Sequence, residues 1–150
     1  MFPWPTGFDK RTRKSSLPGP DLVGLQRYDA PRFVFGQVKS SSENRAPPQV
    51  VNSTDDCLCK QMFQLRHQEF QPTLISWLSP RIRGASWEDS FNKALKRYSE
   101  GDLWLVGALV SGSREPVETD LTNIRARIDH QAGAAEVHPL GFYLPYHKNN

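Results

Sequence analysis

The sequence predicts a mixed α/β domain, because short strand-like runs alternate with segments of helical spacing. Two runs near the start, residues 21–25 and 33–39, are apolar, and the second is rich in the aromatic and β-branched residues that favour strands. Apolar residues between positions 58 and 98 recur at helical spacing instead. A nearly continuous apolar run at 103–110 is typical of a strand buried on both faces. The predicted order is strand, strand, helix, helix, strand, helix, strand.

Length and composition limit the classes of protein that this chain can form. Its 150 residues fit a single domain over residues 1–150, with a modest core because only 37% of them are hydrophobic. No run approaches the ~20 apolar residues that span a bilayer, and the first residues show no secretory signal. Two cysteines are too few for a disulfide framework, and the single residue between Cys57 and Cys59 disfavours structural zinc. We therefore expect a cytoplasmic protein with reduced thiols and no membrane partner.

The first 20 residues are predicted to be irregular and basic, with a short strand near residues 7–9. Prolines and glycines interrupt this segment, which favours irregular backbone. Its basic residues are Lys10, Arg11, Arg13 and Lys14. Basic side chains on such an arm can reach the phosphates of a nucleic acid, whereas a solvated tail accounts for them equally well.

The two apolar runs are predicted to pair as an antiparallel hairpin whose turn spans residues 26–32. A polar loop is expected over residues 40–56, where serines and a proline pair occur. The apolar positions that follow predict a helix that either kinks at Pro72 or divides into two helices there. Pro80 is expected to end this helical region.

A further amphipathic helix is expected over residues 87–98, with Ser86 as its N-cap and Gly101 at its end. A weaker amphipathic pattern predicts a last helix over residues 120–132. The run at 141–145 is predicted to be an edge strand stopped by proline.

Three polar residues lie at the ends of the predicted hairpin strands. Asp21 starts the first strand, and Gln37 and Lys39 end the second. Residues two apart on a strand share a face, so Gln37 and Lys39 project together, opposite the Asp21 end. Mg²⁺ prefers oxygen ligands, and a lysine beside it can orient a water or stabilise charge on a phosphate. In outline this is a phosphodiester hydrolysis site, although an ordinary strand start and a solvated lysine explain the same residues.

This arrangement resembles that of the PD-(D/E)xK nucleases, whose fold is also called restriction endonuclease-like. The resemblance rests on Pro20-Asp21, fifteen intervening residues and then Gln37-Val38-Lys39. The segment 35–41 is also similar to the metal strand of nuclease subunits in bacterial antiviral defence systems, including the Hachiman type. The resemblance implies a mixed sheet flanked by helices, with Asp21, Gln37 and Lys39 as catalytic residues. It implies Asp21, Gln37 and Val38 as ligands of Mg²⁺ or Mn²⁺.

The function that the resemblance implies is hydrolysis of DNA phosphodiester bonds, by an effector of antiviral defence or DNA repair. DNA is the implied substrate. The implied partners are a helicase, another defence-system subunit or a further copy of the chain. Gln64, early in the helix after the metal strand, would join the basic N-terminal residues in contacting nucleic acid. The alternative is a catalytically inactive nuclease-like module that binds DNA or a partner.

Two departures from the family pattern bear on activity. Gln37 stands where the family usually has an acid, and its neutral amide oxygen can ligate Mg²⁺ only with lower affinity. The family also usually has a helix before the first strand, which Pro3 and Pro5 disfavour within residues 1–9. The chain is therefore expected to be a truncated product, a fragment, or a subunit that a partner completes.

Overall fold

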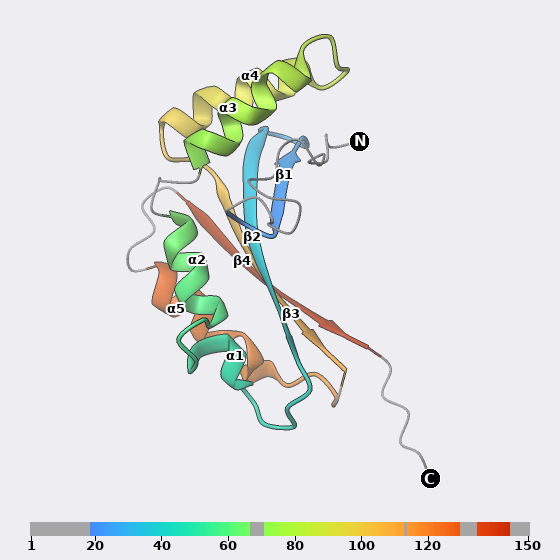
Figure 1. Cartoon of the computed structure of the whole chain (residues 1–150), viewed down its shortest axis with the longest axis vertical. Helices are drawn as coiled ribbons and strands as arrows, with labels where there is room; N and C mark the ends of the chain where they lie inside the picture. The colour runs from blue at the N-terminus through green and yellow to red at the C-terminus, as the bar shows by residue number, and fades with distance from the viewer. Residues whose placement is uncertain (1–18, 67–70, 113, 130–134, 145–150) are drawn as a thin grey trace, which may run out of the picture.

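A four-stranded mixed sheet flanked by helices organises the molecule (Figure 1). The computed structural model describes residues 19–66, 71–112, 114–129 and 135–144. Its elements are β1 (Leu22–Gln26), β2 (Arg32–Ser41), α1 (Gln49–Asn52), α2 (Leu58–Arg66), α3 (Gln71–Ile82), α4 (Glu88–Ser99), β3 (Trp104–Ser111), the 3₁₀ turn η2 (Glu118–Asp120), α5 (Thr122–Asp129) and β4 (Glu136–Tyr143). The mixed α/β class predicted from the sequence is confirmed.

The strands lie in the order β1-β2-β3-β4. β1 and β2 pair antiparallel, with Leu22 opposite Gly36 and Gln26 opposite Arg32, which confirms the predicted hairpin. β3 is parallel to both β2 and β4. Parallel neighbours need long crossover connections, and here the helices supply them. β3 is therefore an inner strand, and its residues are largely buried on both faces, as predicted.

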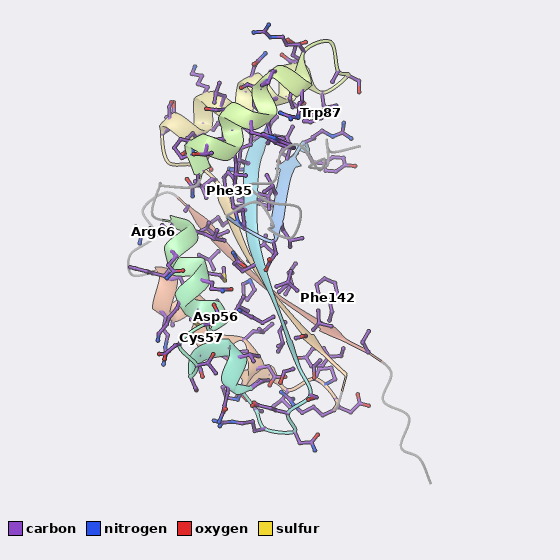
Figure 2. All side chains as sticks on the ribbon, viewed as in Figure 1. Phe35, Asp56, Cys57, Arg66, Trp87 and Phe142 are labelled. Carbon is purple, nitrogen blue, oxygen red and sulfur yellow. The ribbon has the colours of Figure 1, made fainter. Side chains whose placement is uncertain are left out.

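The helices cover one face of the sheet, and the core lies between them and that face. Phe33 and Phe35 of β2 are fully buried, and the ring of Phe33 packs edge-on against Phe91 and Tyr98 of α4. Figure 2 shows Phe35 on the helix side of the sheet and Phe142 on the other side. Because side chains alternate along a strand, every second residue of β2 points toward the helices.

The predicted helical region from Leu58 divides into two helices. α2 ends at Arg66 and α3 begins at Gln71, so Pro72 lies in the first turn of α3, where its missing N–H leaves no helical bond unmade. The expectation that Pro80 ends the region is wrong, because α3 continues to Ile82. Pro80 lacks the N–H that would bond the Ser76 carbonyl one turn earlier, yet two more residues of α3 follow it, and the second, Ile82, is buried in the core.

The start of α4 also differs from the prediction. Trp87, not Ser86, is the N-cap residue, and its side chain makes no capping bond. The Glu88 carboxylate instead accepts a hydrogen bond from the Gly84 N–H at 2.8 Å, which ties the preceding turn to the helix. Gly101, with φ of 79°, follows the end of α4 as expected, because glycine tolerates this left-handed backbone.

Two boundaries differ from the prediction. The expected loop over 40–56 contains the end of β2 and the short helix α1, whose Val51 is buried. β4 begins at Glu136 rather than at residue 141, and it accommodates Pro139 because it is an edge strand. α5 ends at Asp129, and the expected helix beyond it, like the expected strand at 7–9, lies outside the described residues. Within the described ranges, no helix is long and apolar enough to span a membrane.

A buried carboxylate ties the segment after β3 to β4. Asp120 is 2% exposed, and it accepts hydrogen bonds from Arg114, from the Tyr143 hydroxyl at 2.6 Å and from the Val117 N–H at 3.2 Å. Burial acts to raise the pKa of Asp120, but these hydrogen bonds outweigh it and lower that pKa. Burial and the bond to Asp120 raise the pKa of Tyr143 to about 12.

Candidate metal centre

Asp21 lies where the sequence places it, directly before β1 and beside the end of β2. The register Leu22–Gly36 would set Asp21 opposite Gln37. Val23 and Leu25 pack against the core, so they point to the helix side of the sheet. Asp21 lies two residues before Val23 and therefore points to the same side. Asp21 Oδ2 accepts a hydrogen bond of 2.9 Å from the backbone N–H of Val38. The carboxylate therefore lies against the backbone of the Gln37-Val38-Lys39 segment.

The backbone of Val38 offers a second oxygen on the same edge of β2. In an antiparallel ladder the N–H and C=O of one residue point to the same neighbouring strand, so the Val38 carbonyl faces the same side as its N–H. Continuing the β1–β2 register would set Val38 opposite Pro20, which has no N–H to donate. Pro20 thus ends the ladder at the point where Asp21 takes over the Val38 N–H.

Gln37 is 8% exposed and lies on the helix side of β2, as Phe35 does. Its amide nitrogen donates to the carbonyl of Gly19 at 3.4 Å. With the amide nitrogen on Gly19, the amide oxygen is left to serve as an acceptor or ligand. Gln37 and Asp21 therefore both lie where residues 19–21 run beside the end of β2.

Lys39 shares the helix side with Gln37, as the alternation predicts, but its ammonium reaches a residue that the sequence did not single out. Lys39 Nζ lies 2.6 Å from Oδ2 of Asp56, in the turn before α2. The amide nitrogen of Gln61 on α2 donates to the other carboxylate oxygen. The hydrogen bond from Lys39 is the largest cause of the lowered pKa of Asp56. The Lys39 side chain is 18% exposed and that of Asp56 is 74% exposed.

Asp56 and Gln61 were missed because spacing did not connect them to the hairpin. An acidic pair, Asp55-Asp56, before an amphipathic helix is an ordinary helix-start signal. Only the packing of α2 on β2 and β3 brings the second acid to Lys39. Figure 2 shows Asp56 and Cys57 together at the start of α2.

The donor set fits a hard divalent cation. The described residues contain no group of three or more His, Cys, Asp or Glu side chains that could hold a metal ion. A site built on Asp21 would therefore combine one carboxylate with the neutral oxygens of Gln37 and Val38. Mg²⁺ is commonly held by one or two carboxylates, with water or substrate phosphate completing its shell. The oxygen chemistry fits Mg²⁺ or Mn²⁺ and does not fit a thiolate-ligated metal.

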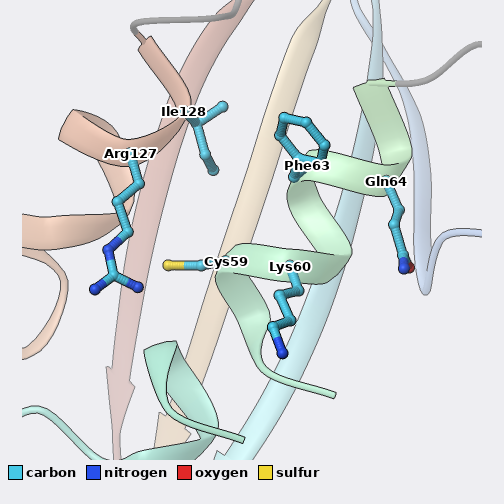
Figure 3. A pocket seen from close by; sticks show the side chains of 6 residues that line it. All are labelled: Cys59, Lys60, Phe63, Gln64, Arg127 and Ile128. Carbon is cyan, nitrogen blue, oxygen red and sulfur yellow. The ribbon is translucent and has the colours of Figure 1, made fainter. Parts of the chain in front are cut away.

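Gln64 lies away from this group. It is exposed on α2 and lines a shallow pocket of about 280 Å³ between α2 and α5. In Figure 3, Cys59 points from α2 toward Arg127 of α5, whereas Gln64 lies at the far border of the pocket. The Gln61 amide, one helical turn earlier, is the α2 group that contacts the Lys39–Asp56 pair. Both cysteines of this region are free and buried.

The four basic residues predicted to contact nucleic acid, Lys10, Arg11, Arg13 and Lys14, lie outside the described residues. The structure therefore describes Asp21, Gln37, Val38, Lys39 and Gln64 of the predicted site. The first three lie together, Lys39 adjoins them on the helix side, and Gln64 faces a separate pocket. Comparison of the chain with protein-family models, with curated proteins and with solved structures found no match.

Proposed function

We propose that this chain is a metal-dependent nuclease of the PD-(D/E)xK type that hydrolyses DNA with Mg²⁺ or Mn²⁺. The observation that carries the proposal is the Asp21 carboxylate lying against the Val38 backbone, 2.9 Å from its nitrogen, beside Gln37. The restriction endonuclease-like fold is proposed with it. An antiparallel hairpin followed by helices and a parallel inner strand supports that fold.

Each residue of the group has a role that follows from its chemistry. Asp21, the Gln37 amide oxygen and the Val38 carbonyl would hold the cation through oxygen ligands. When bound, the cation would polarise a phosphate and lower the pKa of a water. The Lys39 ammonium would donate to the attacking water or to a phosphate oxygen and stabilise the negative charge that develops there. Because Gln37 is neutral, we expect weaker cation binding than a second carboxylate would give.

The partners and setting remain part of the proposal. Lys10, Arg11, Arg13 and Lys14 supply positive charge near the start of the chain, where contact with DNA phosphates would release counterions. The resemblance to defence-system nucleases favours an effector of antiviral defence or DNA repair that acts with a helicase or another subunit.

The test of the proposal measures cation binding and DNA cleavage on the same samples. Asp21→Asn removes the charge yet keeps an oxygen that can accept the Val38 N–H, so the hairpin should persist. We expect Asp21→Asn to lower Mn²⁺ affinity in calorimetry by at least about tenfold, and to reduce cleavage of plasmid DNA accordingly. Lys39→Ala should abolish most cleavage while Mn²⁺ still binds. Asp89→Asn, an exposed change on α4, is the matched control and should alter neither.

The second candidate is a nuclease-like module that binds DNA or a partner without cutting. The observation that favours it is the composition of the candidate metal site. Asp21 supplies its one carboxylate, and the neighbouring Gln37 supplies a neutral amide. A chain that retards DNA in gel shifts but neither binds Mn²⁺ nor cleaves DNA would support the module. Equal cleavage by the wild type, Asp21→Asn and Lys39→Ala would reject the site assignment altogether.

A further inference from the structure

Both carboxylate oxygens of Asp56 accept hydrogen bonds. One oxygen of Asp56 accepts from Lys39 at 2.6 Å, and the other accepts from the Gln61 amide. A carboxylate with both oxygens engaged has little rotational freedom, so its position is set by its two donors and its own backbone. Lys39 therefore meets a fixed acceptor rather than a freely rotating side chain.

The backbone around Asp56 is fixed by burial. Cys57 and Leu58, the next residues along the chain, are 1% and 0% exposed. The Gln61 N–H donates to the Cys57 carbonyl at 3.0 Å, which joins the turn to the first turn of α2. Asp56 is largely solvent-exposed as a side chain, yet it sits on a backbone that the core holds in place. An exposed carboxylate on an anchored backbone suits a functional contact better than a packing role.

Lysine is the residue of the group that most needs such a partner. Its four-carbon stem has many accessible rotamers, so an unpaired ammonium samples many positions. Catalytic groups act most efficiently when neighbouring contacts hold them close to the reacting position. The contact with Asp56 therefore restricts the most flexible side chain of the site, that of Lys39.

We propose that Asp56 is a positioning residue that holds the Lys39 ammonium on the helix side of β2, the side that Lys39 shares with Gln37 and Asp21, and that Gln61 fixes Asp56 in turn. This inference rests on the proposed nuclease function and deepens it. Asp56 acts through Lys39 and is assigned no contact with the cation or the DNA. The neighbouring Asp55 provides a matched comparison, because it pairs with the exposed Lys60 at 3.2 Å instead.

The experiment uses the full chain and measures single-turnover cleavage of plasmid DNA in Mg²⁺ together with Mn²⁺ affinity. Asp56→Asn should lower the cleavage rate constant about tenfold, a loss typical of removing a residue that orients a reacting group, and leave Mn²⁺ affinity within about twofold. Gln61→Ala should lower the rate in the same direction by a smaller factor. Asp55→Asn should leave the rate unchanged. In a Lys39→Ala background, Asp56→Asn should have no further effect, because its action passes through Lys39.

A second readout follows Lys39 directly. In chains labelled with ¹³C at the lysine Cε, the resonance that Lys39→Ala removes should shift in Asp56→Asn and not in Asp55→Asn. Two outcomes would overturn the inference while the proposed function stands, provided that the wild type cleaves DNA. Either Asp56→Asn leaves the cleavage rate unchanged, or it lowers the rate by the same factor in the Lys39→Ala background as in the wild type. A wild-type chain that binds no Mn²⁺ and cleaves no DNA would refute the proposed function, and the positioning role with it.

Discussion

Gly107 of β3 is the position where a single methyl group should disturb the contact between the sheet and α2. It lies beside Gln37 in the β2–β3 register. A Cβ at this position would overlap the sulfur of Met62, and would lie 3.2 Å from the Met62 methyl and 3.5 Å from a methyl of Leu58. Both residues are fully buried on α2. The change Gly107→Ala must therefore displace Met62 or the helix that carries it.

The expected loss of stability is the difference between two opposing effects. Adding a methyl group to a well-packed core typically costs about 1–3 kcal/mol. Replacing glycine by alanine inside a strand gives back about 0.5–1 kcal/mol by reducing the entropy of the unfolded chain. The steric cost wins, so we expect Gly107→Ala to lower the free energy of unfolding by about 1–2 kcal/mol. For a chain of this length that corresponds to a fall in Tm of about 2–8 °C.

A double-mutant cycle with Met62→Ala makes the steric explanation testable by urea denaturation. Met62→Ala alone should cost about 2–5 kcal/mol, because it opens a cavity against Gly107. In that background the new methyl group has room, so Gly107→Ala should be neutral or stabilising. We expect a coupling energy of at least about 1 kcal/mol between the two positions. If Gly107→Ala lowers stability equally in both backgrounds, or not at all, the proposed fit of α2 over β3 is wrong.

Three further predictions concern charged and titratable groups. Asp102 is 20% exposed and pairs with Arg32 and Arg97, so Asp102→Asn should cost about 1–2 kcal/mol in urea denaturation, whereas Asp89→Asn, which breaks an exposed helical pair, should cost less than about 0.5 kcal/mol. Because the pKa of Asp120 is held below 3.8, its contribution to stability is present above that pH and should be lost as the pH falls further; Asp120→Asn should flatten this acid limb of the denaturation midpoint. The pKa of Tyr143 is raised from 10 to about 12, so its contribution is present below pH 10 and should be lost as the pH rises toward 12; Tyr143→Phe should remove that alkaline dependence, and an unchanged alkaline limb would contradict the assignment.

The prediction of the hairpin and its polar residues depended on local rules, and those rules held. The alternation along 33–39 follows from strand geometry, so Gln37 and Lys39 share the helix side of β2 with Phe35. Pro20 before Asp21 reads as a strand start, and the register bears this out. Whether these residues bind a cation stays a prediction.

At two prolines, tertiary context offsets a local penalty. The expectation that Pro80 ends a helix overlooks the core beyond it: Ile82, two residues later, is buried, which favours a last turn that continues past the proline. The last strand was predicted to begin at residue 141, but β4 begins at Glu136 and accommodates Pro139, because an edge strand has an outer side that needs no partner. In both places the proline lacks an N–H donor, and its surroundings in the fold let the helix or strand continue.

Local sequence patterns were enough to predict the kinds of element, the antiparallel hairpin and the shared face of Gln37 and Lys39, because periodicity and strand alternation act over a few neighbouring residues. Long-range packing brings Asp56 to Lys39, and it turns Gln61 rather than Gln64 toward that pair. Those contacts depend on how α2 packs over Gly107 and Met62. Packing of this kind is a property of the whole core, and no short spacing in the chain records it.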